Sequence, residues 1–239
     1  MRDQEDISIE GVVAATRGLI VSCQAYPGEP LREPIITGRM CQAVVEGGAV
    51  AVRVQGVSDI QAARQSVQVP VIGLIKYGAA GVYITPSIAH ARACALAGAS
   101  IVAIDATKRP RLEGNFAQAC QAIHEEFPGV AVMADCGSLD DALAAQDAGA
   151  DLVGTTLAGY TPDRPKTVGP DFELIDCVCE RIDKPIVVEG RIHTVEQLEQ
   201  VWQRPIHAAC VGTAITHPTT ITRWFAQATD NSQTKVDTP

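Results

Sequence analysis

Aromatic residues and basic residues are both scarce in this 239-residue sequence. Aromatic residues make up 4% of the chain, and the 19 Lys and Arg are outnumbered by 28 Asp and Glu, which gives a net charge of −9. Nucleic-acid binding needs clustered positive charge, and single-strand binding also needs aromatic stacking surfaces. We therefore expect no nucleic-acid partner. A small anion held by backbone N–H groups stays possible, because such a site needs few basic side chains.

Long apolar runs are also absent. The longest, Cys94 to Ile104, is far shorter than the roughly 18 residues that a membrane-spanning helix requires. The first residues, Met1 to Asp6, are acidic, unlike the basic start of a signal peptide. The 46% hydrophobic content argues against disorder, and the length allows one large domain or two small ones. We expect a soluble protein with no membrane partner.

Sequence motifs for metal, hydrolase and dinucleotide chemistry are missing. The eight cysteines form no CxxC pair, and Cys177 and Cys179, the only close pair, lie in a helical pattern. The five histidines show no HxH or HxxxH spacing, and neither GxSxG nor GxGxxG occurs. We expect buried free thiols in a reducing cytoplasm, no metal site and no dinucleotide cofactor.

Short apolar runs alternate with helical patterns along almost the whole chain. Such continuous runs are typical of parallel strands that are buried on both faces. The expected strands are 19–23, 49–54, 71–75, 100–104, 130–134, 151–154, 185–188 and 207–211, and the expected helices are 37–47, 58–67, 87–97, 115–126, 138–148, 170–182, 194–203 and 217–228.

Eight such units predict a single (β/α)8 barrel domain, an α/β fold of the TIM type, over residues 1–228, with an open doubly wound sheet as the alternative. Gly48, Gly98 and Gly149 recur at helix ends, where glycine supplies a left-handed C-cap. Ser58, Ser138 and Thr194 are expected N-caps, Thr194 in a capping box with Gln197. The polar segment 229–239 is expected to be a disordered tail.

In such a barrel the active site lies on the loops that follow the strands. Every expected strand ends in polar residues or in glycine, although the strands themselves are apolar. These residues are Ser22, Gln24, Arg53, Gln55, Lys76, Asp105, Thr107, Lys108, Asp135, Thr155, Thr156, Glu189, Gly190, Arg191, Gly212 and Thr213.

Lys76 and Glu189 are the sharpest candidates for acid–base chemistry. A lysine at a buried strand end, near a cation such as Arg53, can have a pKa low enough to act as a base. The plainer interpretations are a lysine that reaches water and a structural ion pair for Glu189. Asp135 and Asp105 could likewise contact substrate or hold loops in place.

Two glycine-containing pairs, Gly190–Arg191 and Gly212–Thr213, follow strands seven and eight. This is the usual phosphate position in the fold, although ordinary tight turns would have the same composition. Together with the acid–base candidates, the pairs indicate proton transfer beside a carbonyl group in a small phosphorylated substrate, without a metal.

Several segments resemble the N-acetylmannosamine-6-phosphate 2-epimerases of sialic acid catabolism. The resemblance covers residues 15–228 and is carried by the segments 22–31 (SCQAYPGEPL), 71–76 (VIGLIK), 82–86 (VYITP), 104–109 (IDATKR), 154–161 (GTTLAGYT) and 188–192 (VEGRI), and by Arg53. The segment 77–81 is shorter than its usual counterpart in the family, so we expect a more flexible loop beside Lys76.

The resemblance implies a cytoplasmic barrel enzyme, commonly a homodimer, that interconverts N-acetylmannosamine 6-phosphate and N-acetylglucosamine 6-phosphate without a redox cofactor. Lys76 would move the C2 proton, with Glu189 as the acidic partner. The implied sugar contacts are Gln24, Arg53 and Asp135, to which Thr155 and Tyr160 are added as expected substrate contacts, and the implied phosphate cradle is Gly190, Arg191, Gly212 and Thr213.

The mechanism and the rival functions stay open at this point. Lys76 could serve both faces of C2, or Glu189 or Asp135 could serve one of them. The rivals are another phosphate-binding barrel isomerase, such as a metal-dependent pentulose-phosphate 3-epimerase, and a non-catalytic sugar-phosphate binding protein.

Overall fold

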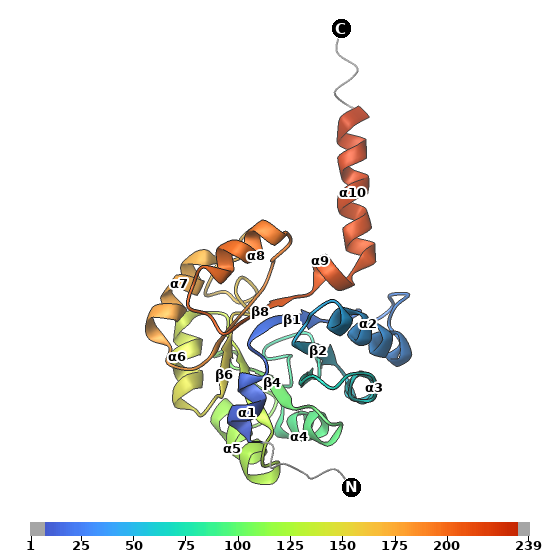
Figure 1. Cartoon of the computed structure of the whole chain (residues 1–239). Coiled ribbons are helices and arrows are strands. Elements are labelled where there is room, and N and C mark those ends of the chain that lie inside the picture. The colour runs from blue at the N-terminus through green and yellow to red at the C-terminus, as the bar shows by residue number, and fades with distance from the viewer. Residues whose placement is uncertain (1–7, 234–239) are drawn as a thin grey trace.

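The computed structural model describes residues 8–233, which form a closed barrel of eight parallel strands in chain order (Figure 1). Gly18–Val21 pair with Ala208–Val211, so the first strand meets the last. This pairing confirms the (β/α)8 barrel over the open sheet. The strands are β1 Gly18–Ser22, β2 Ala51–Gln55, β3 Val71–Leu74, β4 Ile101–Asp105, β5 Ala131–Asp135, β6 Leu152–Gly154, β7 Ile186–Glu189 and β8 Ala208–Val211.

Helices alternate with the strands around the outside of the barrel. They are α2 Pro34–Glu46, α3 Val57–Ser66, α4 Ile88–Leu96, α5 Phe116–Glu126, α6 Leu139–Asp147, α7 Phe172–Arg181 and α8 Val195–Trp202. Ser138 and Thr194 cap α6 and α8 as expected. The Ser58 cap is wrong, because Gly56, with φ of +90°, precedes α3 and Ser58 lies inside the helix. Gln197 accepts from the His193 N–H, which leaves only half of the expected capping box.

The glycine repeat is confirmed at all three positions. Gly48, Gly98 and Gly149 have φ of +105°, +101° and +97°, a region that disfavours side chains with a Cβ. Each one ends a helix and turns the chain back into the next strand.

Strand side chains alternate between two apolar layers. Ile20, Ile72 and Leu74 belong to a cluster inside the barrel, whereas Val21 and Val71 pack with helix residues outside it. Because both faces are buried, the strands read as continuous apolar runs. Among the helices within residues 8–233, none is long and apolar enough to cross a membrane.

The expected free thiols are confirmed. All eight cysteines fall within the described residues, none forms a disulfide, and six are buried. Burial raises the pKa of Cys94 and Cys120 to about 12, so these thiols stay protonated near neutral pH.

A short helix at the start of the chain was not expected. Helix α1, Ile9–Ala14, places Val12 and Val13 against the inner cluster, beside first residues of strands such as Ala51 and Ala208. His207, just before β8, contacts the carbonyl of Val13. The helix therefore covers the amino end of the barrel. The acidic opening, Met1 to Asp6, lies outside the described residues.

The C-terminal segment departs from its expected structure. The helix expected at 217–228 is present as α10, Pro218–Gln233, which is longer at its C-terminal end and projects away from the barrel (Figure 1). A separate short helix, α9, Thr213–Thr216, precedes it. Residues 229–233 continue α10, so this helix extends into the segment expected to be a tail. This segment has no proline or glycine to stop a helix. Residues 234–239 lie outside the described residues.

Shortening a buried side chain of α1 should destabilise the barrel. We expect Val13→Ala to lower the free energy of unfolding by about 2 kcal/mol, because it removes apolar contacts at the amino end. Urea denaturation measures the change. Glu10→Gln, at an exposed position of the same helix, is the control and should stay within about 0.5 kcal/mol. Equal effects of the two substitutions would contradict a packing role for α1.

Candidate active site

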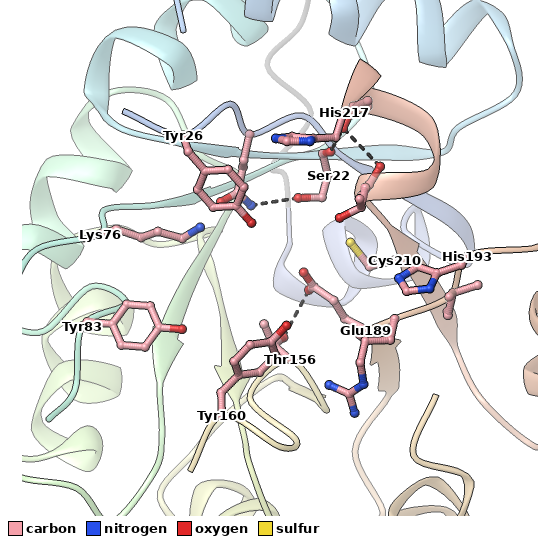
Figure 2. A pocket seen from close by; sticks show the side chains of 17 residues that line it. Ser22, Tyr26, Lys76, Tyr83, Thr156, Tyr160, Glu189, His193, Cys210 and His217 are labelled. Carbon is pink, nitrogen blue, oxygen red and sulfur yellow. Dashed lines mark hydrogen bonds between the residues drawn. The ribbon is translucent and has the colours of Figure 1, made fainter. Parts of the chain in front are cut away.

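A cavity of about 350 Å³ opens at the carboxyl ends of the strands. Figure 2 shows Lys76 and Glu189 pointing into it from different sides, with the rings of Tyr26, Tyr83 and Tyr160 around them. The other lining residues come from several strand ends and the loops that follow: Ser22, Gln24, Thr156, Gly190, Arg191, Ile192, His193, Cys210, Gly212, Thr213, Thr216 and His217.

Arg53 anchors the charged groups beneath this cavity. Its guanidinium is 1% exposed and donates to both oxygens of the Asp135 carboxylate, at 3.0 and 2.6 Å. The same group lies 3.2 Å from Glu189 Oε2. Burial alone would lower the pKa of Arg53, but the two acidic groups outweigh it and raise the pKa. Arg53 thus stays charged inside the barrel.

Lys76 lies two residues after the end of β3, and an antiparallel bridge to Ile84 holds its backbone. Its pKa is lowered to about 8, first by burial and then by the nearby charge of Arg53, with Glu189 and Asp135 acting in the opposite direction. Its Nζ lies 5.3 Å from the centre of the Tyr26 ring. An amine with this pKa is partly neutral near physiological pH and can accept a proton.

Glu189, at the end of β7, faces the cavity and also contacts Arg53. Its side chain is 16% exposed. Burial raises the pKa of Glu189, and the negative charge of Asp135 adds to the rise, against the opposing effects of Arg53, Thr156 and Lys76. The two interpretations of this residue therefore coexist, because Glu189 is both an ion-pair partner and a carboxyl group open to a ligand.

Two adjacent threonines after β6 have different environments. Thr155 Oγ1 accepts from the backbone N–H of Glu189 and donates to its carbonyl, so this hydroxyl joins β6 to β7 outside the cavity lining. Thr156 lines the cavity, and its hydroxyl lies 2.7 Å from Asp135 Oδ1 and 3.1 Å from Glu189 Oε2. Sequence reasoning favoured Thr155 for substrate contact, whereas the structure directs Thr156 to the site.

The four residues expected to form a phosphate cradle all line the cavity, and they follow the neighbouring strands β7 and β8. Gly190 has φ of +126°, and the space beside its Cα is open. Arg191 has φ of +57°, rare for a residue with a side chain. A Cβ at Gly212 would come within 3.2 Å of Ser22. These positions leave backbone groups bare at the edge of the cavity.

The side chain of Arg191 also organises the neighbouring loop. Its guanidinium donates to the carbonyls of Ala158 and Gly169 and to Thr167 Oγ1. These bonds fix the segment that carries Tyr160. The Cζ atom of Arg191 lies 5.8 Å from the centre of the Tyr160 ring. Tyr160 lines the cavity as expected.

The remaining candidates divide between the cavity and its supports. Gln24 lines the cavity, and its Oε1 is buried without a hydrogen-bond partner. Asp105 accepts from Thr107 and Arg109, which gives it the loop-holding role. Asp135 is fully buried beneath the cavity.

Within residues 8–233, no group of three or more His, Cys, Asp and Glu side chains is arranged to hold a metal ion. The expectation of a metal-independent site stays a prediction.

The β1–α2 loop contributes Tyr26, a lining residue that sequence reasoning did not select. Tyr26 packs edge-on against His217, with ring centres 5.4 Å apart. Glu29 links the two, because its carboxylate accepts from the Tyr26 N–H at 2.7 Å and lies 2.7 Å from His217 Nε2. Tyr26 lay within a recognised segment, but nothing in the spacing placed it beside Lys76.

Comparisons with known proteins agree on one family. A family model described as "Putative N-acetylmannosamine-6-phosphate epimerase" matches residues 37–231. A Cutibacterium acnes protein described as "Putative N-acetylmannosamine-6-phosphate 2-epimerase" is 52% identical over 220 residues, covering 91% of this chain and 96% of the relative. A protein of the same description from Caldanaerobacter subterraneus subsp. tengcongensis is 45% identical over 211 residues, covering 87% and 89%.

The fold agrees as well. The solved structure of the N-acetylmannosamine-6-phosphate 2-epimerase from Clostridium perfringens matches with a TM-score of 0.86 and 37% identity, covering 91% of this chain and 95% of that one. A thiamine phosphate pyrophosphorylase from Pyrococcus furiosus, 17% identical with a TM-score of 0.57 over 86% and 89% of the two chains, shares the fold alone.

A closed (β/α)8 barrel with a polar cavity at the carboxyl ends of its strands has the architecture of a barrel enzyme. Within this class, the chain belongs to the N-acetylmannosamine-6-phosphate epimerase family. It is thus an isomerase that acts on carbohydrates, and the resemblance seen in the sequence is confirmed.

The lowered pKa of Lys76 can be measured without a substrate. We expect its reactivity with an acylating reagent, followed by mass spectrometry, to rise with pH to half its maximum near pH 8, because only the neutral amine reacts. Lys108 is the control: it lies on the same rim, and its pKa is raised by Asp140. If both lysines follow the same pH curve, the lowered pKa is wrong.

Proposed function

We propose that the protein interconverts N-acetylmannosamine 6-phosphate and N-acetylglucosamine 6-phosphate. The observation that carries the proposal is that Lys76 and Glu189 line one cavity together with Gly190, Arg191, Gly212 and Thr213. Relatives named for this reaction support the choice of substrate. The proposed setting is sialic acid catabolism in the cytoplasm, where the eight free thiols would stay reduced.

The residues that line the cavity suggest how the substrate lies. Its phosphate would bind at the four expected cradle residues, near the N-terminus of α9, and C2 would lie near Lys76 and Glu189. Binding at the phosphate, remote from the reacting carbon, would orient C2 and contribute to lowering the barrier.

The chemistry begins with ring opening, because C2 is acidic only when C1 is a free aldehyde. Glu189 would exchange a proton with the ring oxygen or O1, and neutral Lys76 would then remove the proton from C2. Backbone N–H groups at the cavity would stabilise the enolate oxygen, because Arg53 lies buried beneath the lining with its terminal nitrogens engaged by Asp135 and Glu189. Return of a proton to the opposite face inverts C2.

The burial of the acidic residues narrows the choice of proton donors. Asp135 is fully buried and held by Arg53 at both oxygens, away from the cavity lining. Lys76 and Glu189 line the cavity. We therefore assign any second acid–base role to Glu189 rather than to Asp135.

Proton NMR in D₂O tests this function. The enzyme should convert N-acetylmannosamine 6-phosphate to its gluco epimer and place deuterium at C2. Lys76→Ala should reduce both processes by at least about 10³-fold, since removing the base removes general base catalysis. Lys108→Ala, at an exposed lysine paired with Asp140, should retain activity. Full activity of Lys76→Ala would sink the assignment of the base.

Incubation with a chelator separates the epimerase from its metal-dependent rival. We expect an unchanged rate, because the proposed steps use only protein side chains. Loss of activity that an added metal ion restores would favour a metal-dependent isomerase. Tight binding of the sugar phosphate without exchange at C2 would favour the non-catalytic binding protein.

The proposal includes a homodimer formed through α10. This helix carries an apolar stripe at Ile221, Trp224, Phe225 and Ala228, a helical spacing, and the Phe225 side chain is 72% exposed. A regular barrel has a helix over each strand, but α10 leaves the barrel after β8 (Figure 1).

A groove on the barrel offers a matching surface. It lies beside α8, has a volume of about 410 Å³, and is lined by Gly18, Leu19, Val195, Leu198, Glu199, Trp202, Gln203 and Ala209. The groove would receive α10 of a second copy, because both surfaces are apolar and the chain's own helix points elsewhere. No nucleic-acid partner is proposed, given the net charge of −9.

Sedimentation of the full chain tests the dimer. The native protein should sediment as a dimer, and Phe225→Glu should shift it toward monomer by placing a charge on the apolar stripe. Gln227→Glu, an exposed substitution on the same helix, should leave the dimer intact. A Phe225→Glu protein that sediments like the native protein would contradict the role of α10.

A further inference from the structure

The hydroxyl of Thr156 stands between two carboxyl groups and has only one hydrogen. Its oxygen lies 2.7 Å from Asp135 Oδ1 and 3.1 Å from Glu189 Oε2 (Figure 2 draws the second contact). The hydroxyl can donate to one carboxyl group only, and its lone pair then faces the other. If both carboxyl groups were ionised, the hydroxyl would donate to one of them, and its oxygen would face the other carboxylate oxygen with no hydrogen between the two. A proton on one carboxyl group would satisfy both contacts.

The surroundings of the two carboxyl groups decide which of them holds that proton. Asp135 is fully buried and accepts two bonds from Arg53 as well as the shorter contact from Thr156. Such bonds favour the ionised form. Glu189 has a single contact with Arg53, at 3.2 Å, the longer contact with Thr156, and a hydrogen bond from the Cys210 thiol, which is a weak donor. The proton therefore belongs on Glu189.

We infer that Thr156 is a positioning residue that donates to Asp135, accepts from Glu189, and so keeps Glu189 protonated and ready to act as an acid. The inference rests on the proposed function for its catalytic meaning, but the hydrogen-bond arrangement can be measured without any substrate. The family resemblance gave no role to the Thr156 hydroxyl and no position to the proton on Glu189.

The proton balance during ring opening follows from this arrangement. Glu189 gives its proton to the ring oxygen as the bond from that oxygen to C1 breaks. The O1 hydroxyl loses its proton to water as the C1 carbonyl forms. Glu189 is then ionised, and the Thr156 hydroxyl can rotate to donate to it. Ring closure reverses each transfer, so Thr156 itself gains and loses no proton.

Other groups around Glu189 also bear on its charge. Arg53 comes from β2, Lys76 follows β3, Asp135 ends β5 and Cys210 lies in β8, with Tyr26 on the β1–α2 loop. Burial and Asp135 raise the pKa of Glu189. Among the described residues, Thr156 is the one uncharged side chain that contacts both Asp135 and Glu189. Its substitution therefore changes the interaction between the two carboxyl groups without removing a charge.

Infrared titration of the free enzyme tests the inference, with the Glu189→Gln spectrum subtracted to isolate the Glu189 carboxyl signal. Thr156→Val removes the hydroxyl at nearly constant shape. The midpoint of Glu189 should move to lower pH by about one unit, a tenfold loss of proton affinity, because the protonated carboxyl loses its acceptor. Thr156→Ser restores a hydroxyl and should restore the native midpoint.

The direction of the shift decides between two arrangements. A hydroxyl that donates to Glu189 would stabilise the ionised form, so Thr156→Val would then move the midpoint to higher pH. An upward shift or an unchanged midpoint overturns the inference. A lower Glu189 midpoint in Thr156→Val, together with a native midpoint in Thr156→Ser, supports the inference.

The same variants in the C2 exchange assay supply a second readout. Thr156→Val should lower kcat by about tenfold with less than a twofold change in KM, and Thr156→Ser should recover most of the loss. If native enzyme fails to exchange the C2 proton, the proposed function fails while the titration result still stands. If exchange occurs but the Glu189 midpoint does not respond to Thr156, only this inference fails.

Discussion

The guanidinium of Arg53 lies inside the barrel, between the carboxyl groups of Asp135 and Glu189. A buried cation is tolerated only with such partners, because burial strips it of hydrating water. Here one positive group meets two acidic groups, so the three cannot all be charged without an excess of negative charge. Lys76 lies close enough to respond to each of them. The properties of the amine and of the carboxyl groups are therefore coupled, and they belong to the set rather than to any one residue.

Much of the fold could be predicted because both of its periodic signals are local. Buried parallel strands such as β2 and β4 read as apolar runs, and glycines such as Gly98 mark the helix ends. Closure into a barrel followed from the number of units rather than from any residue. Helix α1 was missed because its six residues are stabilised by the barrel that they cover. Helix α10 was expected as a helix, but its direction was not, because sequence periodicity cannot tell where a helix points.

A site residue could be predicted wherever its position at the end of a strand alone decides whether it reaches the cavity. Lys76, Glu189 and the glycine pairs all reach the cavity. The threonines after β6 show the limit, since one residue of register separates a hydroxyl that joins two strands from one that contacts two carboxyl groups. Tyr26 and His217 meet from opposite ends of the chain, and only the closed barrel brings them together.

Helix α1 affects the route by which a ligand can enter and leave the barrel. Val12 and Val13 pack over the amino end, and residues such as Ile72 and Met133 fill the interior, so the barrel formed by residues 8–233 is closed at its amino end. A ligand must leave through the opening by which it came. If the two epimers are substrate and product, they enter and leave through the same opening and bind at the same site. Each would then compete with the other at every turnover, and the direction of net flow would be set by their relative amounts outside the protein.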